Sequence, residues 1–289
     1  MGSQADHARH WREVQRRKRG HTLMFCAGLA AATLWSAWMS DVNLSKLFSN
    51  IGNFFGYFDR ILTLDSGPAM GRRVWTAPGE WLWGLDKWLP LLADTLLMAY
   101  LGTLLGALGA LALCFAPARN LTPNPWARVA ARRFLEFCRT VPEIVFALIF
   151  VVAFGLGPMA GVLAIAVHTA GALGKQFSEV VENIDMKPVE GLMASGAARW
   201  PTIRFAVIPQ ILSNVVSYCL MRFEINVRGA SVMGFVGAGG IGQDLIEAIR
   251  KFYYADVSAL LLLIVLCVCV IDFLSEKLRH ALLEREAHA

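Results

Sequence analysis

Long apolar runs dominate this chain, and they restrict what it can fold into. Apolar residues make up 56% of the sequence and charged residues 17%, whereas a soluble domain is usually near a quarter charged. A helix that crosses a bilayer needs roughly 20 mostly apolar residues. Six runs approach this length, at about 22–40, 88–115, 134–155, 158–177, 203–223 and 257–278. The sequence therefore predicts an all-α membrane protein with about six transmembrane helices. A soluble protein with an unusually large core is the alternative.

Basic residues gather just before the first apolar run, and their position predicts the topology. They are Arg9, Arg12, Arg16, Arg17, Lys18 and Arg19. A basic cluster beside a membrane segment marks the cytoplasmic side, and no recognition pattern for a nucleic acid accompanies it. No small-residue cleavage site clearly follows, so we expect a retained helix rather than a signal peptide. Six spans then place both termini and the loops 116–133 and 175–204 in the cytoplasm.

The segment between the first two runs is too polar to cross a membrane comfortably. In residues 44–64 the apolar side chains follow a helical stripe, which is typical of a helix lying along the membrane surface. Trp75, Trp81, Trp83 and Trp88 come next and suit the membrane interface. We divide the chain into a basic cytoplasmic segment (1–21), a first helix with surface helix and outer loop (22–87), a membrane core (88–278) and a cytoplasmic tail (279–289).

A polar segment interrupts the apolar runs near the middle of the core. Residues 190–209 read EGLMASGAARWPTIRFAVIP. Pro188 stands where prolines often begin a helix, and Trp200 is pushed out of helical geometry by Pro201. We therefore predict a short helix over 187–201. An ordinary loop between two spans is the alternative.

The spacing of this segment carries a family resemblance. Glu190, Gly196 and Pro209 follow the pattern of the cytoplasmic signature loop in membrane subunits of bacterial ABC importers, which reads Glu-Ala-Ala, then Gly, then Ile-x-Leu-Pro. The chain departs from that form at Gly191, Leu192, Ala206 and Ile208, all by small apolar exchanges. The resemblance implies that the segment docks an ATPase, with Glu190, Gly191, Ser195, Gly196, Arg199 and Pro209 as the docking residues.

A glycine cluster further along admits two interpretations. Gly237, Gly239 and Gly242 form a GxGxxG pattern, which can mark a dinucleotide-binding turn. No alternation of strands and helices surrounds it, and the apolar run that follows suits a membrane span. We therefore interpret Gly237, Gly239, Gly240 and Gly242 as a gate or turn on the outer side.

The residues around the glycine turn indicate which branch of these permeases the chain resembles. The sequence VGAGGIG at 236–242 and the sequence RTVPE at 139–143 are similar to motifs of the phosphonate-type branch of ABC importer permeases. The similarity extends over about 89–278. It implies the type I importer fold with a coupling helix at 187–201. It also implies an inner-membrane protein that carries a phosphonate, phosphite or hypophosphite, with methionine- or betaine-type permeases as alternatives.

Further expectations about partners follow from the resemblance alone. It implies a second copy of this chain, two copies of a cytoplasmic ATP-binding subunit, and a periplasmic or lipid-anchored substrate-binding protein. The chain has no GxxxxGK[ST] phosphate loop, HExxH or GxSxG motif, so we expect no enzyme activity and no metal. ATP and Mg²⁺ would be bound by the partner. An ion-coupled transporter is a rival, and a membrane-anchored NAD enzyme is another.

Charged residues inside apolar runs are costly and mark candidate sites. Arg139 and Arg228 suit an oxyanion, because a guanidinium can donate to two oxygens at once. The alternative is that Glu136, Glu143 or Glu224 neutralises them, since each lies three or four residues, about one helical turn, from its arginine. We predict a substrate path that includes Arg139, Thr140, Glu143, Asn226 and Arg228.

Overall fold

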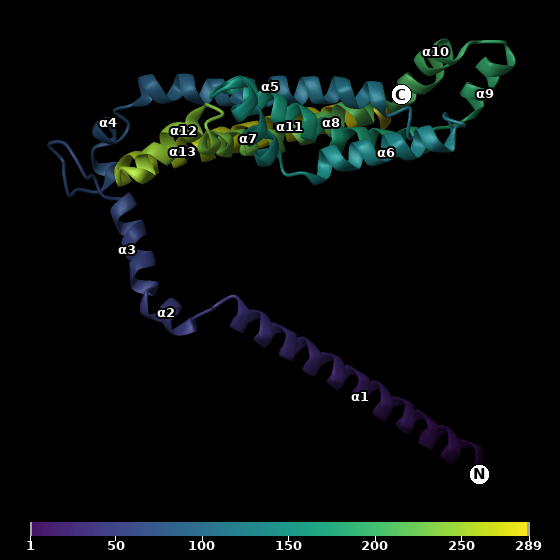
Figure 1. Cartoon of the computed structure of the whole chain (residues 1–289), viewed down its shortest axis with the longest axis horizontal. Coiled ribbons are helices and arrows are strands. Elements are labelled where there is room, and N and C mark those ends of the chain that lie inside the picture. Colours follow the sequence, from purple (N-terminus) through teal and green to yellow (C-terminus); the bar gives the residue numbers. More distant parts are fainter. Residues whose placement is uncertain (1, 288–289) are drawn as a thin grey trace. The chain divides into compact units, whose positions relative to one another are not determined.

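The computed structural model describes the backbone of residues 2–287 (Figure 1). Side chains are described at residue 11 and over 15–281. The side chains of Arg9 and Arg12 and the last part of the predicted tail therefore lie outside the described residues. Within the described part, secondary structure is helical apart from an isolated β-bridge between Thr63 and Arg73. The all-α prediction is confirmed.

The chain divides into two compact units, at 1–58 and 59–289. The first holds α1 (Gly2–Met39), α2 (Leu44–Ser49) and most of α3 (Ile51–Ile61). The Asn43 side chain caps α2 by accepting a hydrogen bond from the Lys46 amide. The predicted surface helix at 44–64 is thus two short helices that meet at Asn50. Their apolar side chains, among them Phe48, Phe54, Phe55 and Phe58, are exposed.

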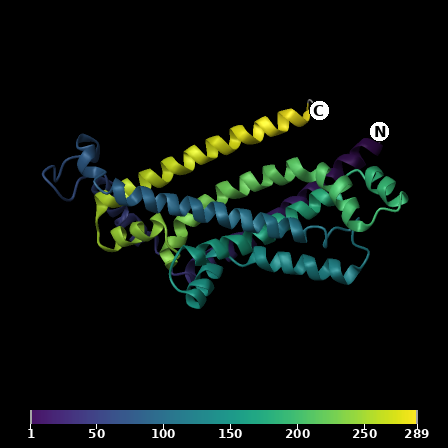
Figure 2. The ribbon, with the colours of Figure 1, turned by 90° about the horizontal axis from the view of Figure 1, so that it is seen from above.

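Four long helices form the body of the second unit. They are α5 (Leu85–Leu113), α8 (Pro158–Glu182), α11 (Ile208–Met233) and α13 (Tyr254–Ala287), and they run lengthwise beside one another (Figures 1 and 2). Glycines allow α5 and α8 to approach closely, because a Cβ at Gly106 would lie 2.6 Å from the Thr169 Cβ. Small residues at helix contacts are a common means of packing in membranes.

The predicted third span, 134–155, is broken. Its residues belong to α6 (Pro125–Thr140) and α7 (Glu143–Phe154), which are bent by 86° relative to each other. Val141 has an extended backbone, with ψ of 123°, because Pro142 excludes the helical conformation from the residue before it. A single continuous helix was therefore wrong, and the physical reason is the Val-Pro step.

By length and apolarity, the described residues contain four candidate spans, or five if the bent pair counts as one. The four are Gln15–Met39, Leu85–Leu113, Arg199–Val236 and Tyr254–Ala281. The predicted fourth span, 158–177, is helical in α8 but does not meet this criterion. Much of α8 is buried among other helices, where Gly, Thr and Ser residues suffice and lipid-facing apolar side chains are not needed.

Short elements close one end of this unit, at the left in Figure 1. They are η1 (Val74–Thr76), α4 (Pro78–Trp81) and α12 (Ile241–Arg250). Trp81 Nε1 donates to Ser258 Oγ at 2.8 Å, and Trp83 Nε1 donates to Asp256 Oδ1 at 2.9 Å. Trp88, predicted at the interface, is 3% exposed and packs in the cluster that includes Ile241. These contacts fix the start of α13 to the loop before α5.

Candidate functional site

The predicted docking helix is α9 (Lys187–Ala194), and a tight glycine turn ends it. The Gly196 amide donates to Met193 O at 3.0 Å, and the Ala197 amide donates to Leu192 O at 3.1 Å. This pair of bonds is the Schellman pattern, which needs a left-handed residue. Gly196 supplies it with φ of +83°. The helix therefore ends before Gly196, and the predicted end at 200–201 was wrong.

The chain resumes helical geometry after this turn instead of stopping at Pro201. The short α10 (Arg199–Thr202) leads through a π-turn, η2 (Ile203–Val207), into α11. The Ile208 amide bonds Ile203 O across that wide turn. Pro209 follows directly and has no amide hydrogen, so a regular helical bond to residue 205 could not form there. The π-turn is a local adjustment of the kind often found at functional sites.

Several contacts hold α9 and its flanks against the helix bundle. Val189 is 1% exposed in the cluster that contains Phe177 and Val207. Gln210 binds residue 185 with both ends of its amide, since its Oε1 accepts from the Asp185 amide and its Nε2 donates to Asp185 O. Packed side chains and the Gln210 hydrogen bonds therefore connect α9 to α8 and α11.

The outward face of α9 and α10 is exposed and could contact a partner protein. Glu190, Gly191, Ser195 and Arg199 are exposed, and so are the large apolar side chains of Met193 (62%) and Trp200 (65%). Ser195 Oγ bonds Leu192 O, and Arg199 Nη2 bonds Thr122 Oγ1. The segment thus combines an apolar contact surface with a rigid base.

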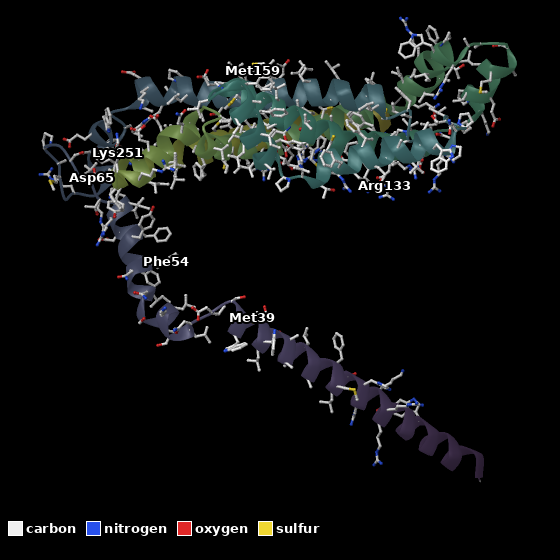
Figure 3. The ribbon with its side chains drawn as sticks, in the orientation of Figure 1. Met39, Phe54, Asp65, Arg133, Met159 and Lys251 are labelled. Carbon is white, nitrogen blue, oxygen red and sulfur yellow. The ribbon has the colours of Figure 1, made fainter. Side chains whose placement is uncertain are left out.

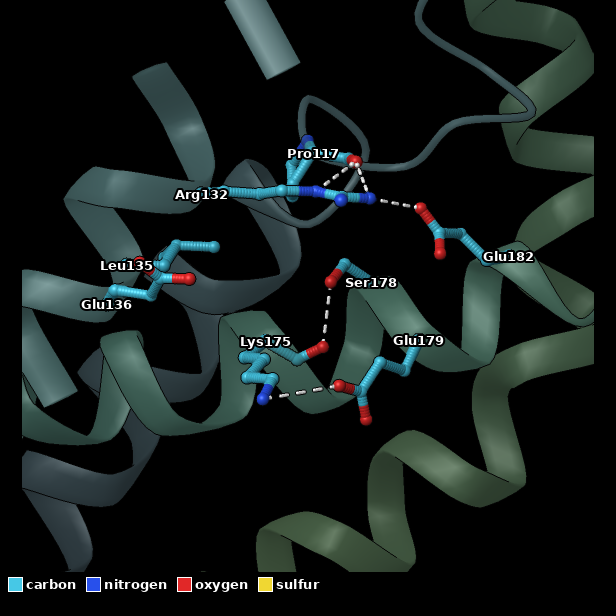
Figure 4. Close-up of a pocket in the computed structure, with 8 residues that line it drawn as sticks. All are labelled: Pro117, Arg132, Leu135, Glu136, Lys175, Ser178, Glu179 and Glu182. Atoms are coloured by element: carbon cyan, nitrogen blue, oxygen red, sulfur yellow. Dashed lines mark hydrogen bonds and ion pairs between the residues drawn. The ribbon is translucent and has the colours of Figure 1, made fainter. Parts of the chain in front are cut away.

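A polar junction joins the loop after α5 to the end of α8 (Figure 4). Arg132, on α6, donates to Pro117 O and forms an ion pair with Glu182 at 2.6 Å. The same Glu182 oxygen accepts the Arg119 amide at 2.8 Å. The small cavity beside these residues has a volume of about 160 Å³. The junction ties the loop after α5 to α6 and to the end of α8.

A polar groove runs between α8 and α11, and the end of α6 lies at its margin. We call it the α8–α11 groove. It has a volume of about 510 Å³, and its polar lining comes from Arg139, His168, Lys175, Gln176, Tyr218 and Arg222, with Glu179. The α8 members recur at helical spacing, as do the α11 members, so each helix offers one polar face. Arg222, Gln176 and Tyr218 were absent from the predicted path.

Three elements meet at His168. Its Nδ1 lies beside Arg222 Nη2, and its Nε2 is 3.1 Å from Arg139 O. With Arg222 as donor, Nδ1 accepts and Nε2–H donates to the carbonyl, so the ring is neutral. The Arg139 carbonyl belongs to the last turn of α6, where helices leave acceptors unpaired. His168 thus connects α6, α8 and α11. Glu143 Oε2 lies 3.7 Å from His168 Nδ1.

The predicted path residues do not converge on one place. Arg139 and Thr140 are exposed at the end of α6, and Glu143 is part-buried at the start of α7. Asn226 is fully buried, where its Nδ2 donates to Thr103 Oγ1 and Thr169 Oγ1. Arg228 pairs with Asp272 on α13 at 3.3 Å, rather than with Glu224. Their assignment to the path stays a prediction, and these contacts give Asn226 and Arg228 packing partners.

The predicted glycine turn is a tightly packed corner. Gly237, Gly239 and Gly240 have φ values of +81°, +83° and +75°, which favour glycine. Gly242 lies against Ser231 O, where a side chain would not fit. The Ile241 amide donates to Thr95 Oγ1 at 2.9 Å. A dinucleotide-binding unit needs a strand before this pattern, and α11 and η3 (Gly234–Val236) precede it instead.

Comparison with known proteins decides the family. Residues 102–285 match the binding-protein-dependent transport system inner membrane component family. The chain belongs to this family. It is therefore an inner-membrane transport component of the ABC importer type, which works with an ATPase and a substrate-binding protein. Among the described residues, no group of His, Cys, Asp and Glu is placed to hold a metal ion.

Similar proteins cover most of the chain. The phosphite transport system permease protein PtxC of Stutzerimonas stutzeri is 37% identical over 226 residues, which is 78% of this chain and 82% of that protein. The putative phosphite transport system permease protein HtxC of the same organism is 33% identical over 273 residues, 94% of this chain and 90% of that protein. The MetNI methionine ABC transporter, in an inward-facing conformation, matches with a TM-score of 0.57 at 20% identity, over 67% of this chain and 95% of the matched one. This last likeness shows the fold.

Proposed function

We propose that this permease carries a phosphorus oxyanion, such as phosphite, hypophosphite or a phosphonate. The observation that carries the proposal is the similarity to a phosphite permease over 78% of this chain and to a putative phosphite permease over 94% of it. The α8–α11 groove is consistent with it, because Arg139, Lys175 and Arg222 supply positive charge. Methionine and betaine are the alternative substrates that an uptake experiment must distinguish from the oxyanion.

The proposed assembly has two copies of this chain around a shared path, two cytoplasmic ATPases, and a periplasmic or lipid-anchored binding protein. Both termini and α9 then lie on the cytoplasmic side, as the basic cluster before the first span favours. The ATPase pair would supply ATP and Mg²⁺ chemistry, and this chain would hydrolyse no nucleotide. Membrane lipid surrounds the helices, and no nucleic acid takes part.

The contacts of α9 indicate how force would enter the membrane. An ATPase held on Met193 and Trp200 would move α9 as a rigid piece, because the Schellman turn and Val189 fix it. Motion then passes to α8 through the cluster around Phe177 and to α11 through Val207. These two helices line the polar groove, so the docking site and the candidate path share the same elements.

Docking can be tested with a matched pair of variants. Met193 is 62% exposed on α9, and Met159, labelled in Figure 3, is 63% exposed near the other end of α8. Burying a Met side chain contributes about 1.5–3 kcal/mol, so Met193→Gln should weaken ATPase binding about tenfold or more. Met159→Gln should leave binding unchanged.

The measurement is the affinity of the purified ATPase for this chain in lipid nanodiscs. Equal affinity for the two variants would place the docking surface elsewhere. Gly196→Asp, which adds a charge and strains the turn, should abolish ATP-driven uptake. Glu190→Ala, which removes a predicted docking carboxylate, should also abolish it. Unchanged uptake in both variants would favour a transporter that needs no ATPase.

A further inference from the structure

We infer that the α8–α11 groove holds a subsite for a phosphorus oxyanion, with the Arg222 guanidinium as its central donor. Arg139 and Lys175 supply the other positive charges, and Gln176 and Tyr218 supply neutral donors. The inference rests on the proposed function for the identity of the anion. It assigns the binding role to Arg222, a residue outside the predicted path.

Arg222 has donors that this chain leaves unused. Its Nη2 donates to His168, while its Nε is buried and has no hydrogen-bond partner. A guanidinium carries five N–H donors, and a buried donor without a partner costs free energy until something satisfies it. Oxyanions of phosphorus accept bidentate bonds from guanidinium groups. The unpartnered Nε, on a side chain that lines a groove of about 510 Å³, is therefore suited to such a ligand.

His168 positions Arg222 rather than binding the anion. The ring bonds Arg139 O on one side and Arg222 on the other, so both nitrogens are occupied. This arrangement fixes the guanidinium and holds the end of α6 near the groove. The ring thus links the Arg139 carbonyl at the end of α6, just before the bend at Val141 and Pro142, to Arg222 on α11.

Two carboxylates reduce the positive charge of the groove. Glu143 Oε2 is buried beside the cluster and has no hydrogen-bond partner, and Glu179 lies 3.6 Å from Lys175 Nζ. His168 is neutral, so the three basic side chains of the groove, Arg139, Lys175 and Arg222, and the two carboxylates leave a net charge of one positive unit. A transporter must bind its cargo well enough to admit it and weakly enough to release it. A partly offset site meets both needs.

The groove continues in a direction that favours release. A second open cavity of about 500 Å³ shares Gln176, Glu179 and Tyr218 with it and extends to Asp185 and Gln210 beside α9. The lining of this second cavity contains no Lys or Arg. An oxyanion that moves from Arg222 toward α9 thus leaves a cationic region for one with neutral and acidic groups.

The test measures occupancy of the groove directly. In the complete transporter in lipid vesicles, Ala172→Cys places a thiol in the groove lining without removing a proposed donor, and a negatively charged thiosulfonate labels it. Mass spectrometry of the peptide that contains position 172 gives the labelling rate. Millimolar phosphite is the probe, and chloride at the same concentration is the control. We expect phosphite, and not chloride, to slow labelling several-fold.

Variants in the same background then test the role of Arg222. Arg222→Gln should abolish the protection by phosphite, and Arg222→Lys, which keeps the charge without the fork, should retain part of it. Arg133→Gln is the matched control, since Arg133 (labelled in Figure 3) is exposed and pairs with Glu136; it should leave protection unchanged. Circular dichroism and ATPase binding show whether each variant folds.

The outcomes separate the subsite from the proposed function. Labelling that phosphite does not affect, or protection that survives Arg222→Gln, overturns the subsite. ATP-driven uptake of phosphite by the unmodified transporter is measured in parallel. Uptake without protection means that the function stands and the subsite is wrong. Protection without uptake means that the subsite stands and the function is wrong.

Discussion

Gly191 and Gly196 are five residues apart and differ in backbone conformation. Gly196 has φ of +83°, whereas Gly191 lies within α9 with a helical backbone, and a Cβ at either position would meet no atom within 4 Å. Space therefore does not decide the effect of a substitution, and backbone conformation does. A non-glycine residue in the left-handed region is strained by about 1–2 kcal/mol.

Gly196→Ala and Gly191→Ala should act in opposite directions on α9. The first strains the Schellman turn, and the second replaces glycine in an exposed helix interior, which stabilises it by up to about 1 kcal/mol. Hydrogen exchange of the amides over 187–198 checks this, with faster exchange expected in Gly196→Ala and slower exchange in Gly191→Ala. Equal rates in the two variants would show that the turn does not determine the stability of α9.

At the scale of single residues, the motif spacing singled out Gly196, but the predicted helix over 187–201 ran through it. The structure instead has a turn there, with φ of +83° at Gly196, and the spacing did not predict that geometry. Arg222 was missed because its role depends on three elements that meet only in the fold: His168 on α8, the end of α6 and its own position on α11. The spacing of Arg222 and its neighbours Tyr218 and Ile225 on one face of α11 was the available signal, but many apolar helices carry such a face.

At the scale of helices, the break between α6 and α7 determines which elements line the α8–α11 groove. The Val141–Pro142 step turns one expected span into α6 and α7. It brings the C-terminal end of α6 to the groove, where His168 caps it. Hydropathy over 134–155 cannot reveal this bend, because α6 and α7 taken together are apolar enough to pass as one span. The Pro before Glu143 was the only local sign of it.

Two glycines on α5 provide a test of the α5–α8 contact. A Cβ at Gly106 would lie 2.6–2.8 Å from Thr169 and Ala166 O, while a Cβ at Gly109 would be 3.6 Å from the Ala170 Cβ, an ordinary contact. Overpacking of this kind costs about 1–3 kcal/mol. We expect Gly106→Ala to lower the Tm of the detergent-purified protein. Gly109→Ala, which meets only an ordinary contact and gains helix propensity, should leave the Tm unchanged or raise it slightly. Similar Tm values would mean that α5 and α8 pack less closely than described.

The second unit has different structures at its two ends. At one end lie α9 and α10, and at the other lie α4 and α12 (Figure 1). The helices α8 and α11 extend from the docking end, and the groove lies between them. The glycine corner at 237–242 and the Trp81–Ser258 contact close the other end. This arrangement connects the proposed docking surface on α9 and α10 to the groove that we propose as part of the path.

Composition and apolar runs were enough to predict an all-α membrane protein, and the motif spacing was enough to predict its family. The number of spans was harder, since α8 is a long helix whose buried surface needs little apolarity. The division of residues 1–87 was predicted from polarity alone, while contacts separate the chain at residue 58. Tertiary contacts such as Trp81 with Ser258 connect positions far apart in sequence, and no local pattern encodes them.

The central claim is that a partner ATPase drives a phosphorus oxyanion through this permease. It is tested most directly by accumulation of phosphite in vesicles that contain this chain, its ATPase and its binding protein, with ATP on the ATPase side. The account predicts ATP-dependent accumulation that methylphosphonate or hypophosphite reduces and that methionine and betaine do not. Accumulation that is equal without ATP, or that carries methionine or betaine in place of phosphite, would contradict it.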